Sequence, residues 1–440
     1  MCPKNPAPET SLELGDWLSY LEQLHSQEIE LGLDRVLVVY RRLLPGGLSG
    51  RTVIVGGTNG KGSTVHALEQ LLLLEDCRTG AYSSPHIHRF NERVRICGEE
   101  VDDAALCRAM AAVEEARGEV SLTYFEFTTL AAFWLFQQAG VVFPLLEVGL
   151  GGRLDAVNIV EPELAIITSV DLDHTQWLGE DRDRIGYEKA GILRAGQPAI
   201  FGDPDPPASV VRQARAQDVL LRLRGRDFGC GEGVDGDYVL LDTNAGSETV
   251  AIQGQIPSPA QQVALQAFRD LGFPVSENRI QWLVNSTRLP GRFERRGGAA
   301  EVVLDVGHNP HAATWLARQL AALPAARQVL AVYAALSDKD VEGVVAALRE
   351  SVDQWFLAGL GGDRGLPCGQ LADRLLKILP EAHQLAHPDV RTALDAALER
   401  AGQGDRVLVF GSFHTVAEAS SVLESLASGA DTGGELHSQH

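Results

Sequence analysis

The sequence has no surplus of basic residues and no long apolar run, and each absence excludes a class of protein. The chain holds 38 Lys and Arg against 59 Asp and Glu, a formal net charge of −21, so the basic footprint of a nucleic-acid-binding protein is missing. The N-terminus lacks the apolar core of a signal peptide, and no apolar run is long enough to span a bilayer. We therefore expect a protein that binds neither nucleic acid nor a membrane.

The six cysteines are scattered along the chain and form no C-x-x-C pair. Disulfide frameworks and zinc sites use cysteines at short, recurring spacings, so reduced thiols in the cytoplasm fit better than either. The remaining composition, 45% hydrophobic and 22% charged, is that of an ordinary globular protein. A length of 440 residues allows two or three domains.

The stretch V-I-V-G-G-T-N-G-K-G-S, residues 53–63, reads as a buried strand, a glycine-rich turn and the start of a helix. The backbone N–H groups of a tight turn, a helix N-terminus and a lysine together bind phosphate. The strict pattern G-x-x-x-x-G-K-[ST] is not met, because Val55 replaces its first glycine and Gly62 follows Lys61. The stretch predicts a phosphate-binding loop, and an ordinary glycine-rich turn is the alternative.

Two later apolar runs, residues 143–155 and 164–175, each end in polar residues. Continuous apolar runs are typical of parallel strands buried on both faces, and chemistry in such sheets gathers at the carboxyl ends of the strands. Glu147 and His174 fall at such ends, and Ser84 follows a shorter strand. A hydroxyl, a carboxylate and an imidazole could bind a divalent metal such as Mg²⁺. The alternative is a glutamate held by its neighbours and a histidine that caps a helix.

The pattern along the chain predicts an α/β protein. Residues 203–260 read as loops with a small antiparallel patch, and L-P-G-R-F-E-R-R-G-G, residues 289–298, reads as a hinge. A second series of strands and helices follows, with strands at Val302–Val306, Val329–Tyr333, Trp355–Ala358 and Val407–Phe410. We expect a nucleotide-binding domain over 1–290, a smaller domain over 291–426 and a disordered tail over 427–440.

Motifs in nearly the whole chain, from about residue 16 to residue 420, resemble one family in its own order. They are G-T-N-G-K-G-S, Y-S-S-P-H, R-V-R-I, L-T-Y-F-E-F, L-E-V-G-L-G-G-R-L-D-A-V-N, D-H-T-Q-W-L-G, I-G-Y-E-K-A-G-I, L-P-G-R-F, D-V-G-H-N-P-H-A and F-G-S-F-H-T-V-A-E. The chain resembles the bacterial bifunctional dihydrofolate synthase/folylpolyglutamate synthases of the Mur ligase superfamily. The resemblance implies a Mur-ligase-type ATP-binding domain with a mostly parallel sheet, followed by a Rossmann-like domain.

The resemblance further implies an ATP- and Mg²⁺-dependent ligase, monomeric and cytoplasmic, that adds L-glutamate to dihydropteroate and to tetrahydrofolate polyglutamates through an acyl phosphate. ATP would be bound by Thr58, Asn59, Gly60, Lys61, Gly62, Ser63, Arg292 and Asp305. Magnesium would be held by Ser84, Glu147 and His174. Lys189 matches a lysine that the family carbamylates, which would turn a cation into an anion; an ordinary contact with phosphate or with Glu188 is the alternative.

The same resemblance implies where the other substrates bind. Dihydropteroate or folate would contact Thr123, Tyr124, Phe125, Glu126, Leu154, Asp155 and Ala156. The aromatic rings offer flat apolar faces to a pteridine, and two core aromatics are the alternative. On the glutamate side the resemblance suggests His308, as a catalytic group, with Ser412 and His414; capping of strand-to-helix turns is their alternative.

The chain departs from the family at Ala260, where an asparagine usually contacts the nucleotide. Gln261 or Gln262 could replace it, because each carries the same amide group. Two other functions stay open. A muramyl-peptide ligase shares the loop, but such enzymes usually carry an extra N-terminal domain, and only about 50 residues precede the loop here. A regulatory nucleotide-binding protein would be favoured by a missing site residue, yet Lys61, Glu147, His174 and Lys189 are all present.

Overall fold

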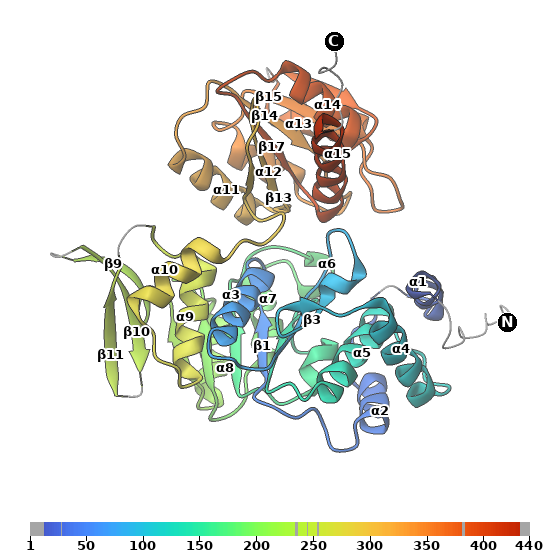
Figure 1. Cartoon of the computed structure of the whole chain (residues 1–440), viewed down its shortest axis with the longest axis vertical. Helices are drawn as coiled ribbons and strands as arrows, with labels where there is room; N and C mark the ends of the chain where they lie inside the picture. Colours follow the sequence, from blue (N-terminus) through green and yellow to red (C-terminus); the bar gives the residue numbers. More distant parts are fainter. Residues whose placement is uncertain are drawn as a thin grey trace, which may run out of the picture. The chain divides into compact units, whose positions relative to one another are not determined.

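The computed structural model describes residues 13–27, 29–233, 236–243, 245–252, 255–380 and 383–431. The chain forms two compact units, unit 1 over residues 1–287 and unit 2 over residues 288–440 (Figure 1). Each is built on its own sheet. The sequence-based boundary lay at residue 290.

Unit 1 contains an eight-stranded sheet in which the pairs β2–β3 and β3–β4 are antiparallel and all other pairs are parallel. In spatial order the strands are β4 (Glu99–Glu100), β3 (Val94–Ile96), β2 (Thr79–Tyr82), β5 (Phe143–Glu147), β1 (Val53–Gly56), β6 (Leu164–Ile167), β7 (Pro198–Phe201) and β8 (Leu220–Leu223). Strand β1 therefore lies between β5 and β6, which brings three carboxyl ends together at the glycine-rich turn.

The central strands are buried at every position because helices cover both faces of the sheet. Alternate residues of a strand point to opposite faces, so Val53 and Val55 share one core and Ile54 belongs to another. The first core includes helices α3 (Lys61–Leu73), α9 (Pro259–Asp270) and α10 (Glu277–Ser286). The second includes α1 (Leu14–Leu24), α2 (Asp34–Leu43), α4 (Asp103–Arg117), α5 (Tyr124–Gln138), α7 (Arg182–Lys189) and α8 (Ala208–Ala216).

Between β7 and α9 the structure holds more regular elements than the sequence predicted. The expected antiparallel patch is a sheet of β9 (Gly229–Gly233), β10 (Gly236–Thr243) and β11 (Gly246–Ala251). Helix α8 and strand β8 stand where the sequence predicts loops. Strand β8 is short and carries Arg222, whose charge interrupts the apolar pattern. That side chain is buried, and its charge is neutralised by ion pairs with Asp242 and Asp270. Such distant partners cannot be read from the local pattern.

Unit 2 contains a six-stranded sheet that is parallel except at β12. In spatial order its strands are β12 (Glu294–Arg296), β13 (Glu301–Asp305), β17 (Arg406–Phe410), β14 (Val329–Tyr333), β15 (Gln354–Ala358) and β16 (Gln384–His387). Its helices are α11 (Pro310–Ala322), α12 (Val341–Leu348), α13 (Cys368–Ile378), α14 (Val390–Arg400) and α15 (Phe413–Asp431). The predicted α/β class with mostly parallel sheets is confirmed, although β12 occupies part of the expected hinge and β16 was not predicted.

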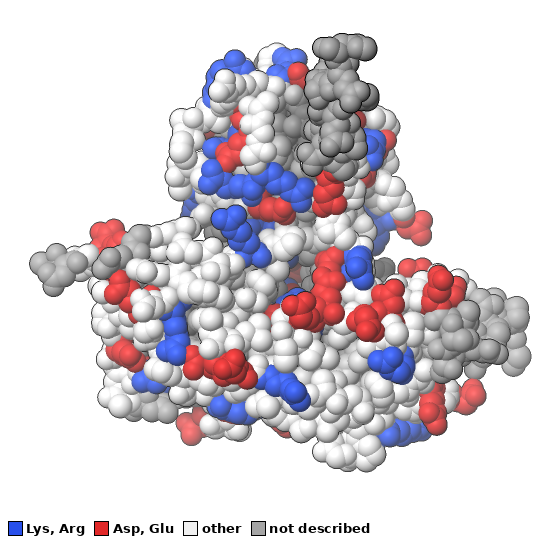
Figure 2. All heavy atoms as spheres, viewed as in Figure 1, with Lys and Arg blue, Asp and Glu red and all other residues white. Residues whose placement is uncertain are grey.

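The predicted tail and the surface complete the description. Helix α15 continues to Asp431, past residue 427 where a disordered tail was expected to begin; residues 432–440 lie outside the described residues. None of the described helices has the length and hydropathy needed to cross a bilayer. Basic and acidic side chains are interspersed on the face drawn in Figure 2.

Candidate active site

The glycine-rich loop, residues 57–60, joins β1 to α3 and has a backbone that requires glycine at two positions. Gly57 has φ +143°, and a Cβ there would overlap Thr168 Oγ1. Gly60 is the N-cap of α3 and is left-handed, with φ +83°. These conformations cost glycine little and other residues much, so the sequence G-G-T-N-G-K sets a sharp turn directly before Lys61.

The end of β6 holds this loop through its own polar residues. Thr168 Oγ1 donates to Asn59 O at 2.7 Å, and Asn59 N donates to Ser169 Oγ at 3.1 Å. Thr58 N donates to Ser169 O at 2.8 Å. The sequence reading missed Thr168 and Ser169; their signal was two polar residues directly after an apolar strand.

Two lysines converge on one carbonyl oxygen of the loop. Lys61 Nζ donates to Gly57 O at 3.1 Å and to Thr58 O at 3.2 Å, and Lys189 Nζ donates to Gly57 O at 2.9 Å. Lys189 is buried, and burial, together with the charge of Lys61, lowers its pKa to about 7. The carboxylates of Asp173 and Asp155 oppose this shift. Near neutral pH a large fraction of Lys189 is therefore an uncharged amine.

A buried carboxylate lies beside the start of α3. Glu147 ends β5, and its Oε2 accepts from Ser84 N at 3.2 Å. A Cβ on Gly62 would lie 3.3 Å from the same oxygen, so this carboxylate lies against the first turn of α3. His174, with φ +51°, precedes the short helix α6 (Thr175–Leu178); its side chain is 32% exposed and its Nε2 lies 4.0 Å from Asp173 Oδ2.

These three residues fit Mg²⁺ better than a metal that needs an all-protein cage. Mg²⁺ keeps several waters and takes few carboxylate ligands together with phosphate oxygens. Within the described ranges no three or more His, Cys, Asp and Glu side chains form a metal-binding group. The structure brings Ser84 and Glu147 into contact beside the loop, and the metal role of the set with His174 stays a prediction.

Two half-buried aromatic rings lie near the start of α5. The Phe125 ring covers Gly149, where a Cβ would lie 2.7 Å from a ring carbon, and its centroid lies 5.9 Å from that of Tyr82. The Arg93 Cζ lies 5.5 Å from the centroid of Tyr124, and burial raises the pKa of Tyr124 to about 12. Both rings are partly exposed and pack against the core of unit 1, so their role as a substrate surface stays a prediction.

Thr123 and Glu126 have a local structural role as the capping box of α5. Glu126 Oε2 accepts from Thr123 N at 2.8 Å, and Arg35 Nε donates to the same oxygen at 2.9 Å. Their contact with a substrate stays a prediction.

Asp155 is buried and accepts from Leu150 N at 2.9 Å and from Val157 N at 3.0 Å. Burial raises its pKa to about 6. On either side of it, Leu154 is partly exposed and Ala156 is buried.

In unit 2 the carboxyl ends of β13 and β17 are neighbours, with Asp305 paired with Phe410. The carboxylate of Asp305 accepts from Phe293 N at 2.8 Å and from Gly307 N at 2.7 Å, and burial raises its pKa. The Arg292 Cζ lies 4.9 Å from the ring centroid of Phe413, so this guanidinium lies over the residue that follows Ser412.

The weaker candidates of unit 2 have contacts of their own. Ser412 Oγ accepts from Thr415 N at 3.0 Å, as a helix cap does. His308 Nδ1 lies 3.0 Å from Val306 O, and His414 is exposed. The capping alternative therefore describes the observed contact of Ser412, and the glutamate-binding role of all three stays a prediction.

The two amides that could replace the family asparagine both form hydrogen bonds within unit 1. Gln261 accepts from Ser258 N at 2.8 Å and donates to Leu283 O at 3.1 Å. Gln262 donates to Pro257 O at 2.8 Å. Gln261 and Gln262, the residues after Ala260, thus stabilise α9 and its surroundings. The hydrogen bonds of these two side chains do not favour a nucleotide contact.

Comparison with known proteins places the chain in one family. Residues 291–413 match the model of the Mur ligase, glutamate ligase domain. The chain is 44% identical over 424 residues to the dihydrofolate synthase/folylpolyglutamate synthase of Escherichia coli (strain K12), covering 96% of this chain and 98% of that protein. The corresponding protein of Haemophilus influenzae is 40% identical, with 93% and 98% covered.

The fold is equally similar to solved structures. E. coli FolC in complex with DHPP and ADP superposes with a TM-score of 0.89 at 43% identity, covering 96% of this chain and 100% of that chain. A bifunctional folylpolyglutamate synthase/dihydrofolate synthase with Mn, AMPPNP and L-glutamate bound has a TM-score of 0.86 at 43% identity, covering 95% and 100%. The Mur-ligase fold is thereby confirmed, and the chain belongs to the dihydrofolate synthase/folylpolyglutamate synthase family of ATP-dependent ligases in folate metabolism.

Proposed function

We propose that this chain, as a cytoplasmic monomer, joins L-glutamate to dihydropteroate and to tetrahydrofolate polyglutamates, with conversion of ATP to ADP and phosphate. The observation that carries the proposal is the convergence of Lys61 and Lys189 on the Gly57 carbonyl, beside the buried carboxylate of Glu147. Solved structures of relatives with DHPP and ADP, and with Mn, AMPPNP and L-glutamate, support the choice of substrates.

The reaction needs activation of a carboxylate, because its oxide leaving group is poor. A carboxylate oxygen attacks the γ-phosphorus of ATP, ADP leaves and an acyl phosphate forms. The glutamate amine then attacks the acyl carbon and loses a proton, and phosphate leaves as the amide forms. The protein contributes positioning and charge neutralisation. Lys61 and the N–H groups at Thr58–Ser63 supply positive charge to the phosphates.

Ser84, Glu147 and His174 would hold Mg²⁺ next to that loop. When bound, the ion neutralises negative charge on the phosphate oxygens. The position of the Glu147 Oε2 next to Gly62, in the first turn of α3, supports this assignment.

Lys189 is proposed to be carbamylated. Its amine attacks CO₂, an N–C bond forms and a proton is released, and only the neutral amine can do this. A pKa near 7 keeps much of the amine neutral. The change would also replace the repulsion between two neighbouring ammonium groups, Lys61 and Lys189, by attraction.

The folate substrate is assigned to the surface around Tyr124 and Phe125. The partly exposed rings offer faces for a pteridine, and Leu154, Asp155 and Ala156 follow the strand end that carries Glu147. Thr123 and Glu126 would support this surface mainly by fixing the start of α5.

The assignments in unit 2 are Arg292 and Asp305 for the nucleotide, and His308, Ser412 and His414 for glutamate. Their support is their shared position at the carboxyl ends of β13 and β17.

The test is glutamate-dependent ADP release by the purified chain with ATP and Mg²⁺, comparing dihydropteroate with tetrahydrofolate, with product masses. We expect both to be accepted, and Asp155→Ala to lower the rate with dihydropteroate. Activity with tetrahydrofolate alone would limit the chain to polyglutamate synthesis. The proposal is refuted if the chain accepts only a UDP-linked muramyl substrate. It is also refuted if no acceptor increases ADP release.

A further inference from the structure

Both ends of helix α7 are bound to the region of the glycine-rich loop. At its C-terminal end, Lys189 Nζ donates to Gly57 O at 2.9 Å. At its first residue, Arg182 Nε donates to Val170 O at 3.0 Å. Val170 lies in the segment that continues from β6.

The contact at Val170 continues directly to the loop. The next residue, Asp171, donates its N–H to Thr58 Oγ1 at 3.0 Å, and its carbonyl accepts from the same hydroxyl at 3.2 Å. The C-terminal end of α7 thus contacts Gly57 directly, and its first residue is linked to Thr58 through Val170 and Asp171. A helix of eight residues is about 12 Å long, so these two connections fix both the position and the tilt of α7.

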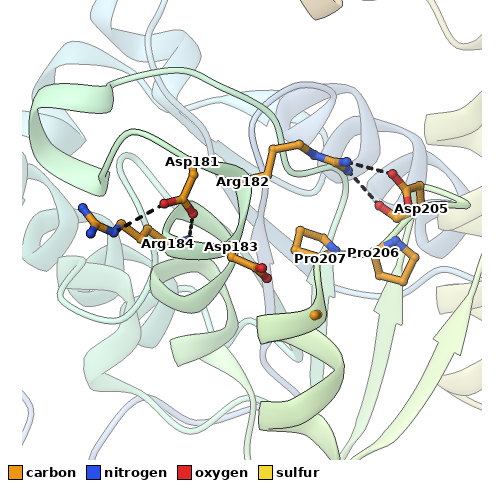
Figure 3. A pocket seen from close by; sticks show the side chains of 8 residues that line it. Asp181, Arg182, Asp183, Arg184, Asp205, Pro206 and Pro207 are labelled. Atoms are coloured by element: carbon orange, nitrogen blue, oxygen red, sulfur yellow. Dashed lines mark hydrogen bonds and ion pairs between the residues drawn. The ribbon is translucent and has the colours of Figure 1, made fainter.

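The Arg182 guanidinium also contacts Asp205, as Figure 3 shows. Its NH1 lies 2.7 Å from Asp205 Oδ2 and its NH2 donates to Asp205 O at 2.8 Å. These groups line a cavity of about 620 Å³. All three Arg182 hydrogen bonds, to Val170 O and to the two Asp205 oxygens, are donated by a charged group, which makes them charge-assisted.

Arg184 is a neighbour that lacks these connections. Its side chain is 70% exposed and pairs within the same turn with Asp181, Nε to Oδ2 at 3.4 Å (Figure 3). The two arginines therefore lie on the same helix, carry the same charge and each pair with a different aspartate, but among the described residues only Arg182 donates a hydrogen bond to the segment that holds the loop. Arg184 is a matched control.

We propose that Arg182 is a positioning residue for the nucleotide site, acting through Val170 and Asp171 on Thr58 and through α7 on Lys189. The proposal rests on the proposed function, because it requires that the loop binds ATP phosphates. Without the guanidinium, the Val170 carbonyl loses this hydrogen bond, and the segment leading to His174 loses one of its contacts with α7. Small displacements of groups that contact phosphate are costly, since a shift of about 1 Å can reduce a rate about 100-fold.

The test compares Arg182→Gln, Arg182→Lys and Arg184→Gln with the parent chain. ADP affinity is measured by calorimetry, KM for ATP and kcat by ADP release, and folding by the thermal midpoint. We expect Arg182→Gln to weaken ADP binding and raise KM about tenfold or more, as loss of a charged hydrogen bond does. Arg182→Lys should recover part of the loss, because lysine can donate to Val170 O but not also to both Asp205 oxygens. Arg184→Gln should stay within about twofold of the parent.

A purely structural role would lower the thermal midpoint and leave the ADP affinity and KM of the folded protein unchanged, and this result would overturn the inference. If Arg182→Gln does not fold, Asp205→Asn replaces it, since Asp205 is exposed. That variant should weaken ADP binding severalfold, and parent-like binding would again overturn the inference. A parent chain that binds no ADP would instead refute the proposed function itself, and the positioning role with it.

Discussion

A buried ion pair between α3 and β3 allows a quantitative test of how the loop helix is held on the sheet. The Glu69 side chain is fully buried, and Arg95 Nε and NH2 both donate to its Oε2, at 2.9 and 2.7 Å. Its Oε1 has no hydrogen-bond partner among the residues that the structure describes. His66 lies 4.0 Å away and cannot replace the arginine, because burial lowers the pKa of His66 to about 4.

Arg95→Leu leaves the Glu69 carboxylate buried without a countercharge. We expect the free energy of unfolding to fall by about 3–5 kcal/mol, as it does when one partner of a buried pair is removed. The double variant Arg95→Leu/Glu69→Leu should recover most of this loss, because no buried charge remains. Arg89→Leu is the matched control: Arg89 is 65% exposed and lies 3.8 Å from Asp103, so its loss should cost below about 1 kcal/mol.

The assay is urea unfolding of the four proteins followed by circular dichroism, with the transitions of the two units fitted separately, since a chain of two units need not unfold in one step. The reasoning fails if Arg95→Leu costs no more than Arg89→Leu. It fails equally if the double variant is as unstable as the single one, because the loss would then not arise from an unpaired charge.

Three further predictions concern the site. Lys61→Ala should keep the fold, by circular dichroism, and weaken ADP binding by about 1.5–3 kcal/mol in calorimetry; near-parent affinity would remove Lys61 from the phosphate site. Lys189→Ala should lose ADP release and regain it when a short-chain carboxylate is added, and no rescue at any concentration would argue against a carbamate. For Asp155, the native pKa of about 6 exceeds the ordinary value of 3.8. Between these two pH values the native state keeps a proton that the unfolded chain releases. The stability that this proton contributes is therefore lost as pH rises from about 4 through about 6. Compared with Asp155→Asn, the parent should lose about 2 kcal/mol of unfolding free energy between pH 4 and pH 7, and parallel stability curves for the two proteins would contradict the assignment.

Local chemistry made the strands and the loop readable from the sequence. The strand Val329–Tyr333 has the bounds that its apolar run predicted, because a strand buried on both faces is apolar at every position. The turn before Lys61 was readable because Gly57 and Gly60 take backbone conformations that other residues resist. Both signals lie within a few consecutive residues.

Residue roles that depend on distant partners were not readable. Thr168 and Ser169 bond to Asn59, about 110 positions earlier in the chain, and only the placement of β6 beside β1 brings them together. Gln261 donates to Leu283 O, 22 positions later, so this bond could not be read from the local pattern.

The sequence by itself therefore determined the α/β class, the phosphate-binding turn and the family motifs, because local backbone preference and burial pattern specify them. Tertiary structure alone decided that Lys61 and Lys189 share the Gly57 carbonyl and that Arg182 reaches Val170. Hydrogen bonds between segments leave no periodic pattern in the chain, and the burial that shifts the pKa of Lys189 arises only when the strands and helices around it are packed.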